Sequence, residues 1–321
     1  MRKVLSQTFI FLFCSLLLTD ITNAQTFASN YSTKSSKHKN TFAPAEDRED
    51  IAVIFAVSKH SKYARKLGWE DLKYSIEDAL ALKWTLENKF GFKVTLYEDP
   101  TWEQMNLAMK KLQTQKWNPL DQLFIFYSGH GHKAPDGTGY LVPSNVGESI
   151  KTYYKMEYLR GQIDQIRCNN VVLTIDACFS STFLERGGRD IPLLESNTDN
   201  KETHQLLSSN QPFRYFIGSS PSNREVVERG IYLKEPRIAG NIKTAKKKFK
   251  VSEFMKSLLE AIEMGEKEYR GGPIPIWYVG RQVEELFEPK KPIRGQEIHA
   301  RATRFGIQSD KGFHFIPVPS N

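Results

Sequence analysis

The stretch LFIFYSGHGH, residues 123–132, decides how the rest of the sequence is interpreted. Its apolar run is rich in β-branched and aromatic residues, which is typical of a strand buried on both faces, and it stops at Ser128. Two histidines, His130 and His132, then follow among glycines. Reactive groups in open α/β sheets collect at the carboxyl ends of parallel strands. The stretch therefore predicts a strand that delivers a histidine to a functional edge.

Strand and helix patterns alternate along most of the chain. Apolar runs typical of buried strands lie at 51–57, 92–98, 121–128, 140–143, 171–176, 212–220 and 312–318. Helical patterns lie at 72–90, after the capping box TWEQ at 101–104, at 153–166, at 252–264 and at 276–287. Such alternation predicts an α/β domain whose mostly parallel sheet is covered by helices on both faces.

Three irregular segments interrupt or precede this pattern. Residues 25–49 are rich in Ser, Thr, Lys and Asn without periodicity and are expected to be a flexible leader. Two inserts follow later, a polar one at about 184–211 and a basic one at about 228–250. Loops of this length inside a compact domain are usually functional or disordered. The ordered domain is therefore expected to span residues 50–317.

The first 24 residues resemble a secretory signal peptide. Arg2 and Lys3 precede the apolar run at 9–18, and small residues at 22–24 offer a cleavage site before Gln25. The apolar run is shorter than the roughly 20 residues that a transmembrane helix needs. We therefore expect a secreted or periplasmic protein, cleaved near Ala24–Gln25, without a membrane anchor.

Composition describes a soluble globular chain. The 321 residues are 40% hydrophobic and 26% charged, with a mean hydropathy of −0.48. Removal of the signal peptide takes away Arg2, Lys3 and Asp20, so the net charge falls from +8 to +7. The basic run KTAKKKFK at 243–250 is interpreted as a solvated loop, and no nucleic-acid partner is expected.

The mature chain would keep two cysteines, Cys168 and Cys178. They flank one apolar run, and ten extended residues span about 30 Å. That distance is too long for a disulfide bond between them. At least one of the two thiols is therefore expected to be free.

Cys178 follows one predicted strand, as His130 follows another, 48 residues earlier. An imidazole beside a thiol takes its proton and leaves a thiolate that attacks carbonyl groups. Gly129 and Gly131 would let a substrate come close, and the Gly131 and Cys178 amides could stabilise an oxyanion. Taken singly, the histidine could be structural and the cysteine a small core residue. The occurrence of both residues at two strand ends is a more specific signal of a catalytic pair than either residue alone.

Several motifs resemble, in order, those of the caspase-like cysteine peptidases, the group that spans caspases, metacaspases and their bacterial relatives. The resembling segments are 75–101, FIFYSGHG at 124–131, GYLVP at 139–143, TIDACFSS at 174–181, GSSPSNREVVE at 218–228 and 252–262. The resemblance implies a three-layer α-β-α caspase-like fold with a mostly parallel six-stranded sheet.

The resemblance also implies roles for single residues. His130 would be the general base and Cys178 the nucleophile, while His132 has no role in the family. Asp176 would line the pocket for the side chain before the cleaved bond and favour Arg or Lys. The alternative for Asp176 is a structural aspartate held by backbone amides. Ser219 and Ser220 would belong to the segment that pairs with extended substrate backbone.

The sequence departs from the family pattern in two places. FSS at 179–181 replaces the His-Ser-Gly usual in metacaspases, so the turn there must form without glycine. The acidic stretch after the histidine motif is reduced to Asp136, which argues against a calcium site or a doubly acidic pocket. No cofactor is expected, although a need for calcium stays open.

The insert at 184–211 suggests self-processing. It lies where family members are often cut during activation, and its Arg186, Arg189 and Lys201 would suit an enzyme that cleaves after basic residues. We therefore expect a secreted cysteine endopeptidase that acts on proteins or peptides.

Two alternatives remain open. The first is a catalytically inactive caspase fold retained for binding. The second uses His130, His132 and Cys178 as metal ligands, for which no fourth ligand occurs at a recognisable spacing. The oligomeric state does not follow from the sequence.

Overall fold

A computed structural model describes residues 48–186, 189–190, 212–220, 230–232, 250–287, 301–304 and 312–318. The predicted signal peptide, nearly all of the leader and most of both inserts lie outside the described residues. Everything described belongs to one compact unit, Glu46–Asn321.

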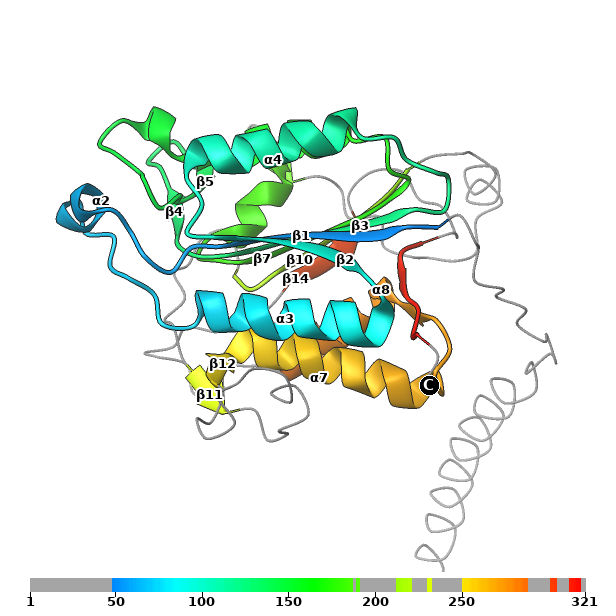
Figure 1. Cartoon of the computed structure of the whole chain (residues 1–321). Helices are drawn as coiled ribbons and strands as arrows, with labels where there is room; N and C mark the ends of the chain where they lie inside the picture. The colour runs from blue at the N-terminus through cyan, green and yellow to red at the C-terminus, as the bar shows by residue number, and fades with distance from the viewer. Residues whose placement is uncertain are drawn as a thin grey trace, which may run out of the picture. The chain divides into compact units, whose positions relative to one another are not determined.

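A six-stranded sheet runs through this unit (Figure 1), in the order β14-β10-β7-β3-β1-β2. Its strands are β1 (Asp50–Ala56), β2 (Lys93–Glu98), β3 (Gln122–Ser128), β7 (Asn170–Asp176), β10 (Phe213–Gly218) and β14 (Arg301–Arg304). Five strands pair in parallel, and β14 runs antiparallel to β10 at the edge. The prediction of a mostly parallel α/β sheet is confirmed.

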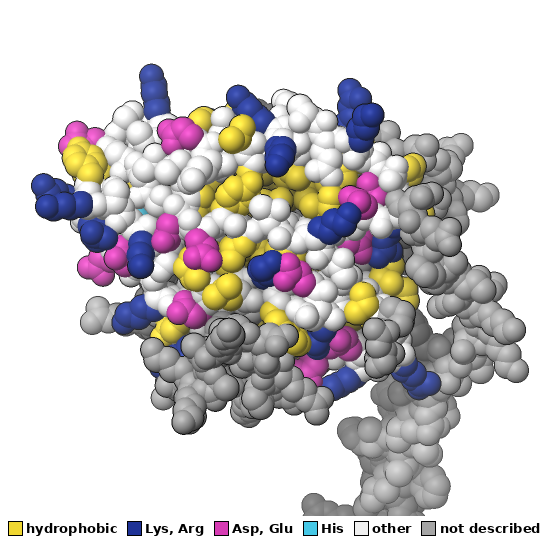
Figure 2. Space-filling view, viewed as in Figure 1, with side chains coloured by type: hydrophobic (Ala, Val, Ile, Leu, Met, Phe, Trp, Pro, Cys, Tyr) yellow, Lys and Arg dark blue, Asp and Glu magenta, His cyan; other side chains and the backbone are white. Residues whose placement is uncertain are grey.

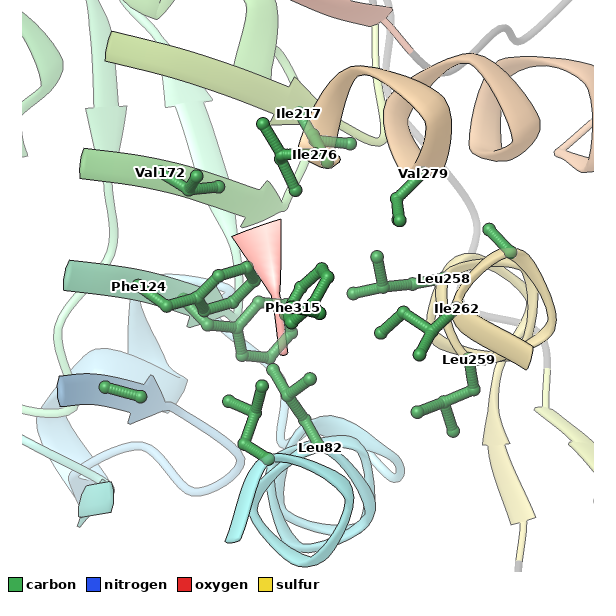
Figure 3. Packing of buried hydrophobic residues seen from close by; sticks show 14 of the residues in the cluster. Leu82, Phe124, Val172, Ile217, Leu258, Leu259, Ile262, Ile276, Val279 and Phe315 are labelled. Carbon is green, nitrogen blue, oxygen red and sulfur yellow. The ribbon is translucent and has the colours of Figure 1, made fainter. Parts of the chain in front are cut away.

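Helices cover both faces of the sheet (Figure 1). One face carries α3 (Ser75–Phe90), α7 (Glu253–Glu268) and α8 (Ile276–Leu286), and the other carries α4 (Trp102–Thr114) and α5 (Met156–Asp164). Figure 3 shows the first of these two cores, where Phe124 and Val172 of the sheet meet Leu82 of α3 and Leu258 of α7.

Strand β3 supplies both cores because its side chains alternate between the faces. Phe124 and Phe126 enter the core under α3 and α7, whereas Leu123, Ile125 and Tyr127 enter the core under α4 and α5. Each is almost fully buried, and burying such a side chain stabilises the fold by about 1.5–3 kcal/mol. The continuous apolar run in the sequence reflects this burial on two sides.

The remaining elements are short. They are α2 (Lys62–Lys66), β4 (Gly131–Lys133), β5 (Gly139–Leu141), β6 (Tyr154–Lys155), β8 (Glu185–Arg186), β9 (Arg189–Asp190), β11 (Gly230–Tyr232), β12 (Lys250–Ser252), β13 (Ile274–Pro275), β15 (His314–Phe315) and the 3₁₀ turns Ile150–Thr152 and Ser180–Leu184.

Two predicted strands do not extend the main sheet. The run at 140–143 forms β5, which pairs with β4 and β6 in a separate antiparallel sheet because a tight turn folds it back on the histidine motif. The run at 312–318 contributes only β15, which pairs with β13. The sixth strand is instead β14, whose sequence RATR has no apolar run that would predict it.

Helix ends follow the sequence signals closely. Thr101 and Gln104 form the predicted capping box of α4. Gly91 ends α3 with φ 70°, a conformation that favours glycine. Helix α3 begins at Ser75 rather than near Leu72, because the Leu72 amide and carbonyl both bond to Ser58 in the preceding loop.

The surface is mixed in charge. In the face shown by Figure 2, basic and acidic side chains are interspersed over the helices. Within the part of the chain that is described, no helix combines the length and apolar character needed to cross a membrane.

Candidate active site

The site begins at the carboxyl ends of β3 and β7, which are neighbouring parallel strands with Ser128 opposite Asp176. His130 lies two residues after Ser128, and Cys178 lies two residues after Asp176. The Gly129 amide donates to the carbonyl of Asp176 at 3.2 Å and extends the pairing past the strand ends. The two strands are neighbours, and both residues stand at the same edge of the sheet.

His130 and Cys178 line one cavity of about 170 Å³. This volume is smaller than the roughly 300–1,000 Å³ of pockets that take a whole small molecule, so it suits a single side chain. Three carboxylates also line it, those of Asp78, Asp176 and Glu253. Among the residues that the structure describes, no lysine or arginine lines it.

Ser252, the residue before α7, connects two of these carboxylates. Its amide donates to Oδ1 of Asp78 at 2.8 Å, and its hydroxyl donates to Oδ2 of Asp176 at 2.9 Å. The same hydroxyl caps α7 by accepting from the Met255 amide at 3.0 Å. The first residues of α7 therefore hold the carboxylates of Asp78 and Asp176 in place.

Helix α3 and helix α7 thus supply acidic groups that the sequence did not predict. The shortened acidic stretch argued against a doubly acidic pocket, and Asp136 itself is exposed in the turn between β4 and β5. The cavity nevertheless has two further acidic lining residues, because Asp78 and Glu253 come from other elements. A signal for Asp78 existed, since it is a charged residue beside the apolar face of the helix at 72–90. No local signal places Glu253 here.

The ring of His130 is oriented by one main-chain carbonyl, and its backbone is held by a tyrosine hydroxyl. Its Nε2 lies 2.8 Å from the carbonyl oxygen of Glu70. Because a carbonyl only accepts, Nε2 must carry the proton, and Nδ1 is left as the nitrogen able to accept one. The buried hydroxyl of Tyr127 lies 3.0 Å from the carbonyl oxygen of His130 and accepts from the Val142 amide at 3.2 Å. Burial raises the pKa of Tyr127, so the phenol stays protonated.

The glycines of the motif are required by close packing. A β-carbon at position 131 would lie 1.9 Å from the carbonyl oxygen of Cys178 and 3.1 Å from its amide nitrogen. A β-carbon at position 129 would lie 2.5 Å from the hydroxyl of Tyr127. Only glycine fits either position without displacing neighbouring atoms.

The turn after Cys178 forms without glycine, as its sequence requires. Phe179 takes a left-handed conformation with φ 58°, which costs a residue with a side chain about 1–3 kcal/mol. Strain of this kind persists only where the surroundings fix it. Here the Phe179 amide donates to the Ser220 hydroxyl at 3.3 Å, and the Ser181 amide donates to the Ser220 carbonyl at 3.0 Å.

Ser219 and Ser220 therefore have contacts that the sequence did not predict. The Ser219 hydroxyl accepts from the Ala177 amide at 3.1 Å, and both serines are fully buried. Their side chains hold the loop that carries Cys178. Residues 221–229, the continuation of the segment expected to pair with substrate, lie outside the described residues. The substrate-binding role of these serines stays a prediction.

His132 lies apart from the cavity. Its ring packs against Trp69, Tyr140 and Tyr153, and burial lowers its pKa. Among the residues that the structure describes, no group of three or more His, Cys, Asp or Glu side chains could hold a metal ion.

Cys168 and Cys178 are not joined by a disulfide bond. Cys168 is fully buried before β7, and burial raises its pKa to about 12. Cys178 is partly exposed in the cavity. The prediction that they are not bridged is confirmed.

Comparison with known proteins identifies the family. A family model of the caspase domain matches residues 49–271. The chain belongs to the caspase-domain family. This is a family of cysteine peptidases that act on protein substrates, in agreement with the resemblance seen in the sequence.

The chain is also similar to a solved structure. Caspase-1 from Spodoptera frugiperda is 16% identical, with a TM-score of 0.49 over 80% of this chain and 86% of that chain. No curated protein sequence matches the chain.

Proposed function

We propose that this protein is an active cysteine endopeptidase in which Cys178 is the nucleophile and His130 the general base. The observation that carries the proposal is the single cavity lined by both residues and by three carboxylates. A thiol and an imidazole at one edge of the sheet, beside a pocket of side-chain size, are the parts that acyl transfer requires.

The reaction follows from the local geometry. Nδ1 of His130 takes the proton from the Cys178 sulfur, and the thiolate attacks the substrate carbonyl carbon. The resulting oxyanion is stabilised by the backbone amides of Gly131 and Cys178. The protonated imidazole then gives its proton to the departing amine, which leaves a thioester. Water, activated by His130, hydrolyses the thioester and restores the thiol.

Substrate preference follows from the charge of the cavity. Asp78, Asp176 and Glu253 supply negative charge, and none of the other described lining residues is basic. Arginine or lysine before the cleaved bond would be attracted, and aspartate would be repelled. The preference for basic residues rests on this set of carboxylates rather than on Asp176 alone.

Fluorogenic peptides with Arg, Lys, Asn or Asp before the cleaved bond test this function directly. We expect hydrolysis after Arg and Lys and none after Asp. Cys178→Ala should abolish hydrolysis, while Cys168→Ala, which removes a buried thiol away from the cavity, should retain it. A folded wild-type protein that cleaves none of these peptides would instead support the inactive, binding form of the fold.

We also propose that the protein is exported and processes itself. Support for export is the basic start, apolar run and small residues at 1–24. N-terminal sequencing of the exported protein should begin at Gln25. Support for processing is the basic residues of the insert at 184–211, including Lys201. Wild-type protein should yield two fragments cut there, and Cys178→Ala should remain one chain.

A further inference from the structure

One loop supplies three contacts to the ring of His130. This loop spans residues 58–72, and its base is closed by two hydrogen bonds between Ser58 and Leu72. The Ser58 and Lys59 amides both donate to Oδ1 of Asp99 at 2.7 Å. The 58–72 loop is therefore anchored to the end of β2 rather than held only by its own residues.

The contacts from this loop are two rings and one carbonyl. The ring of His60 lies 5.2 Å from the ring of His130, with 45° between their planes. The ring of Trp69 lies 5.3 Å from it, with 51° between the planes. Glu70 provides the carbonyl that accepts from Nε2 at 2.8 Å. Trp69 is itself fixed by a 3.0 Å hydrogen bond from Nε1 to the hydroxyl of Tyr153.

His60 is an unusual residue for its position. It is 3% exposed, and within the described part of the chain neither ring nitrogen has a hydrogen-bond partner. Buried polar atoms without partners are rare in native proteins and call for a functional or structural reason. Packing against a neighbouring ring that gains charge during a reaction is such a reason.

The surroundings keep His60 uncharged. Burial, with a smaller contribution from His130, lowers its pKa from 6.5 to about 4. Two carboxylates, Asp71 and Asp99, act in the opposite direction, and Arg65 acts in the same direction as burial. Arg65 and Asp71 also bond to the main chain of His60, at its carbonyl and amide. Near neutral pH the ring is therefore a neutral aromatic face.

We propose that His60 and Trp69 are positioning residues that clamp the ring of His130 and stabilise its protonated form when it takes the proton of Cys178. An aromatic face within about 6 Å of a cation attracts it, and Trp is the strongest of these partners. A neutral ring at His60 suits the same purpose, whereas a charged one would repel the imidazolium. The inference rests on the proposed role of Cys178 and His130.

The test follows the pH dependence of Cys178 alkylation by iodoacetamide, which needs no peptide substrate. His60→Leu and Trp69→Leu fill most of the space without an aromatic face, whereas His60→Phe and Trp69→Phe keep one. We expect the Phe variants to retain the wild-type midpoint, which is the pH at which the alkylation rate reaches half of its maximum. The Leu variants should shift it upward by about one pH unit, so that alkylation at pH 7 slows roughly tenfold. Circular dichroism establishes that each variant is folded.

A matched control is His314→Leu, which removes a partly buried histidine on β15 that makes no contact with the cavity. Its alkylation midpoint should not move. Wild-type midpoints in the folded Leu variants would overturn the clamp. So would Phe variants that shift as far as the Leu variants. If His60→Leu does not fold, His60→Gln replaces it with the same expected shift.

The outcomes separate this inference from the proposed function. A chain that cleaves no peptide but shows the alkylation shift refutes the peptidase and keeps the clamp. If the protein is an active peptidase and neither Leu substitution moves the pH midpoint of alkylation, the clamp is refuted and the proposed function stands.

Discussion

The backbone of Gly131 lies directly against that of Cys178, with no room for a β-carbon between them. This contact joins the loop after β3 to the loop after β7 at the point where the proposed oxyanion donors meet. The spacing of the two loops is therefore set by main-chain atoms, and it depends on the absence of one side chain.

Gly131→Ala should reduce kcat strongly, because a β-carbon would push the two loops apart and move the amides from the oxyanion. Removing one oxyanion donor in peptidases costs about 10²–10³-fold in kcat. Gly161→Ala is the matched control, because its β-carbon meets no atom within 4 Å and it lies inside α5. That change should leave kcat alone and stabilise the helix by about 0.5–1 kcal/mol. Equal kcat values in the two variants would contradict the assigned geometry.

Asp176→Asn and Asp78→Asn should each lower kcat/KM for Arg peptides by roughly tenfold or more, because each removes a cavity carboxylate that would pair with the substrate cation. Hydrolysis of an Asn peptide should change much less, so the ratio of the two rates is the measurement. Asp136→Asn serves as the control, since this carboxylate is exposed in the β4–β5 turn. A preserved Arg preference in both cavity variants would exclude these carboxylates as its cause.

Ser252→Ala should lower the ratio of Arg-peptide hydrolysis to Asn-peptide hydrolysis without abolishing activity. It removes the donor to Asp176 and the cap of α7, and loss of such a cap costs about 0.5–2 kcal/mol of stability. The Arg-to-Asn rate ratio and the melting temperature measure the two effects separately. A variant that melts earlier but keeps the wild-type ratio would limit Ser252 to capping.

Iodoacetamide at pH 7.5 should modify Cys178 and spare Cys168. Burial raises the pKa of Cys168 to about 12, so its thiol stays protonated far above this pH, and the thiolate is the reactive form. For protein that begins at Gln25 and so lacks Cys14, intact-mass measurement should find a single adduct on the folded protein and a further one after unfolding. Rapid modification of Cys168 in the folded state would contradict its buried position.

Acid should destabilise the protein partly through His60. Its pKa is about 4 when folded and 6.5 ordinarily, so its contribution is present above pH 6.5 and is lost as pH falls toward 4. The loss from this residue is on the order of 2 kcal/mol. Urea unfolding at pH 7 and pH 4.5 should show a smaller difference for His60→Leu than for wild type. Equal differences would mean that His60 is protonated in both states.

Local sequence patterns predicted the parts of the fold that local physics determines. The run at 121–128 is buried on both faces, Thr101 and Gln104 form a cap, and Gly91 ends a helix, so each element is specified by its own residues. Strand pairing was harder to predict. The apolar run at 140–143 indicates a buried strand, but it does not indicate which sheet that strand joins.

The same division applies to the candidate site. His130 and Cys178 could be predicted because strand ends in this type of sheet collect reactive groups. Glu70 contributes through its carbonyl, which every residue possesses, so no side chain signals it. Glu253 enters the cavity only after α7 has packed on the sheet, and His60 meets His130 only after the 58–72 loop has closed.

The pairing of β3 with β7, in which Ser128 lies opposite Asp176, has a consequence for how substrate preference can change among proteins of this architecture. The proposed base and nucleophile follow the central strands β3 and β7, whereas Asp78 and Glu253 stand in the first turns of helices α3 and α7. Changes to the helix starts can redirect which peptides are chosen without disturbing the bond-breaking groups. Under the proposed function, two of the three cavity carboxylates can therefore vary with the helix starts, while Asp176 stays tied to the strand that precedes the nucleophile.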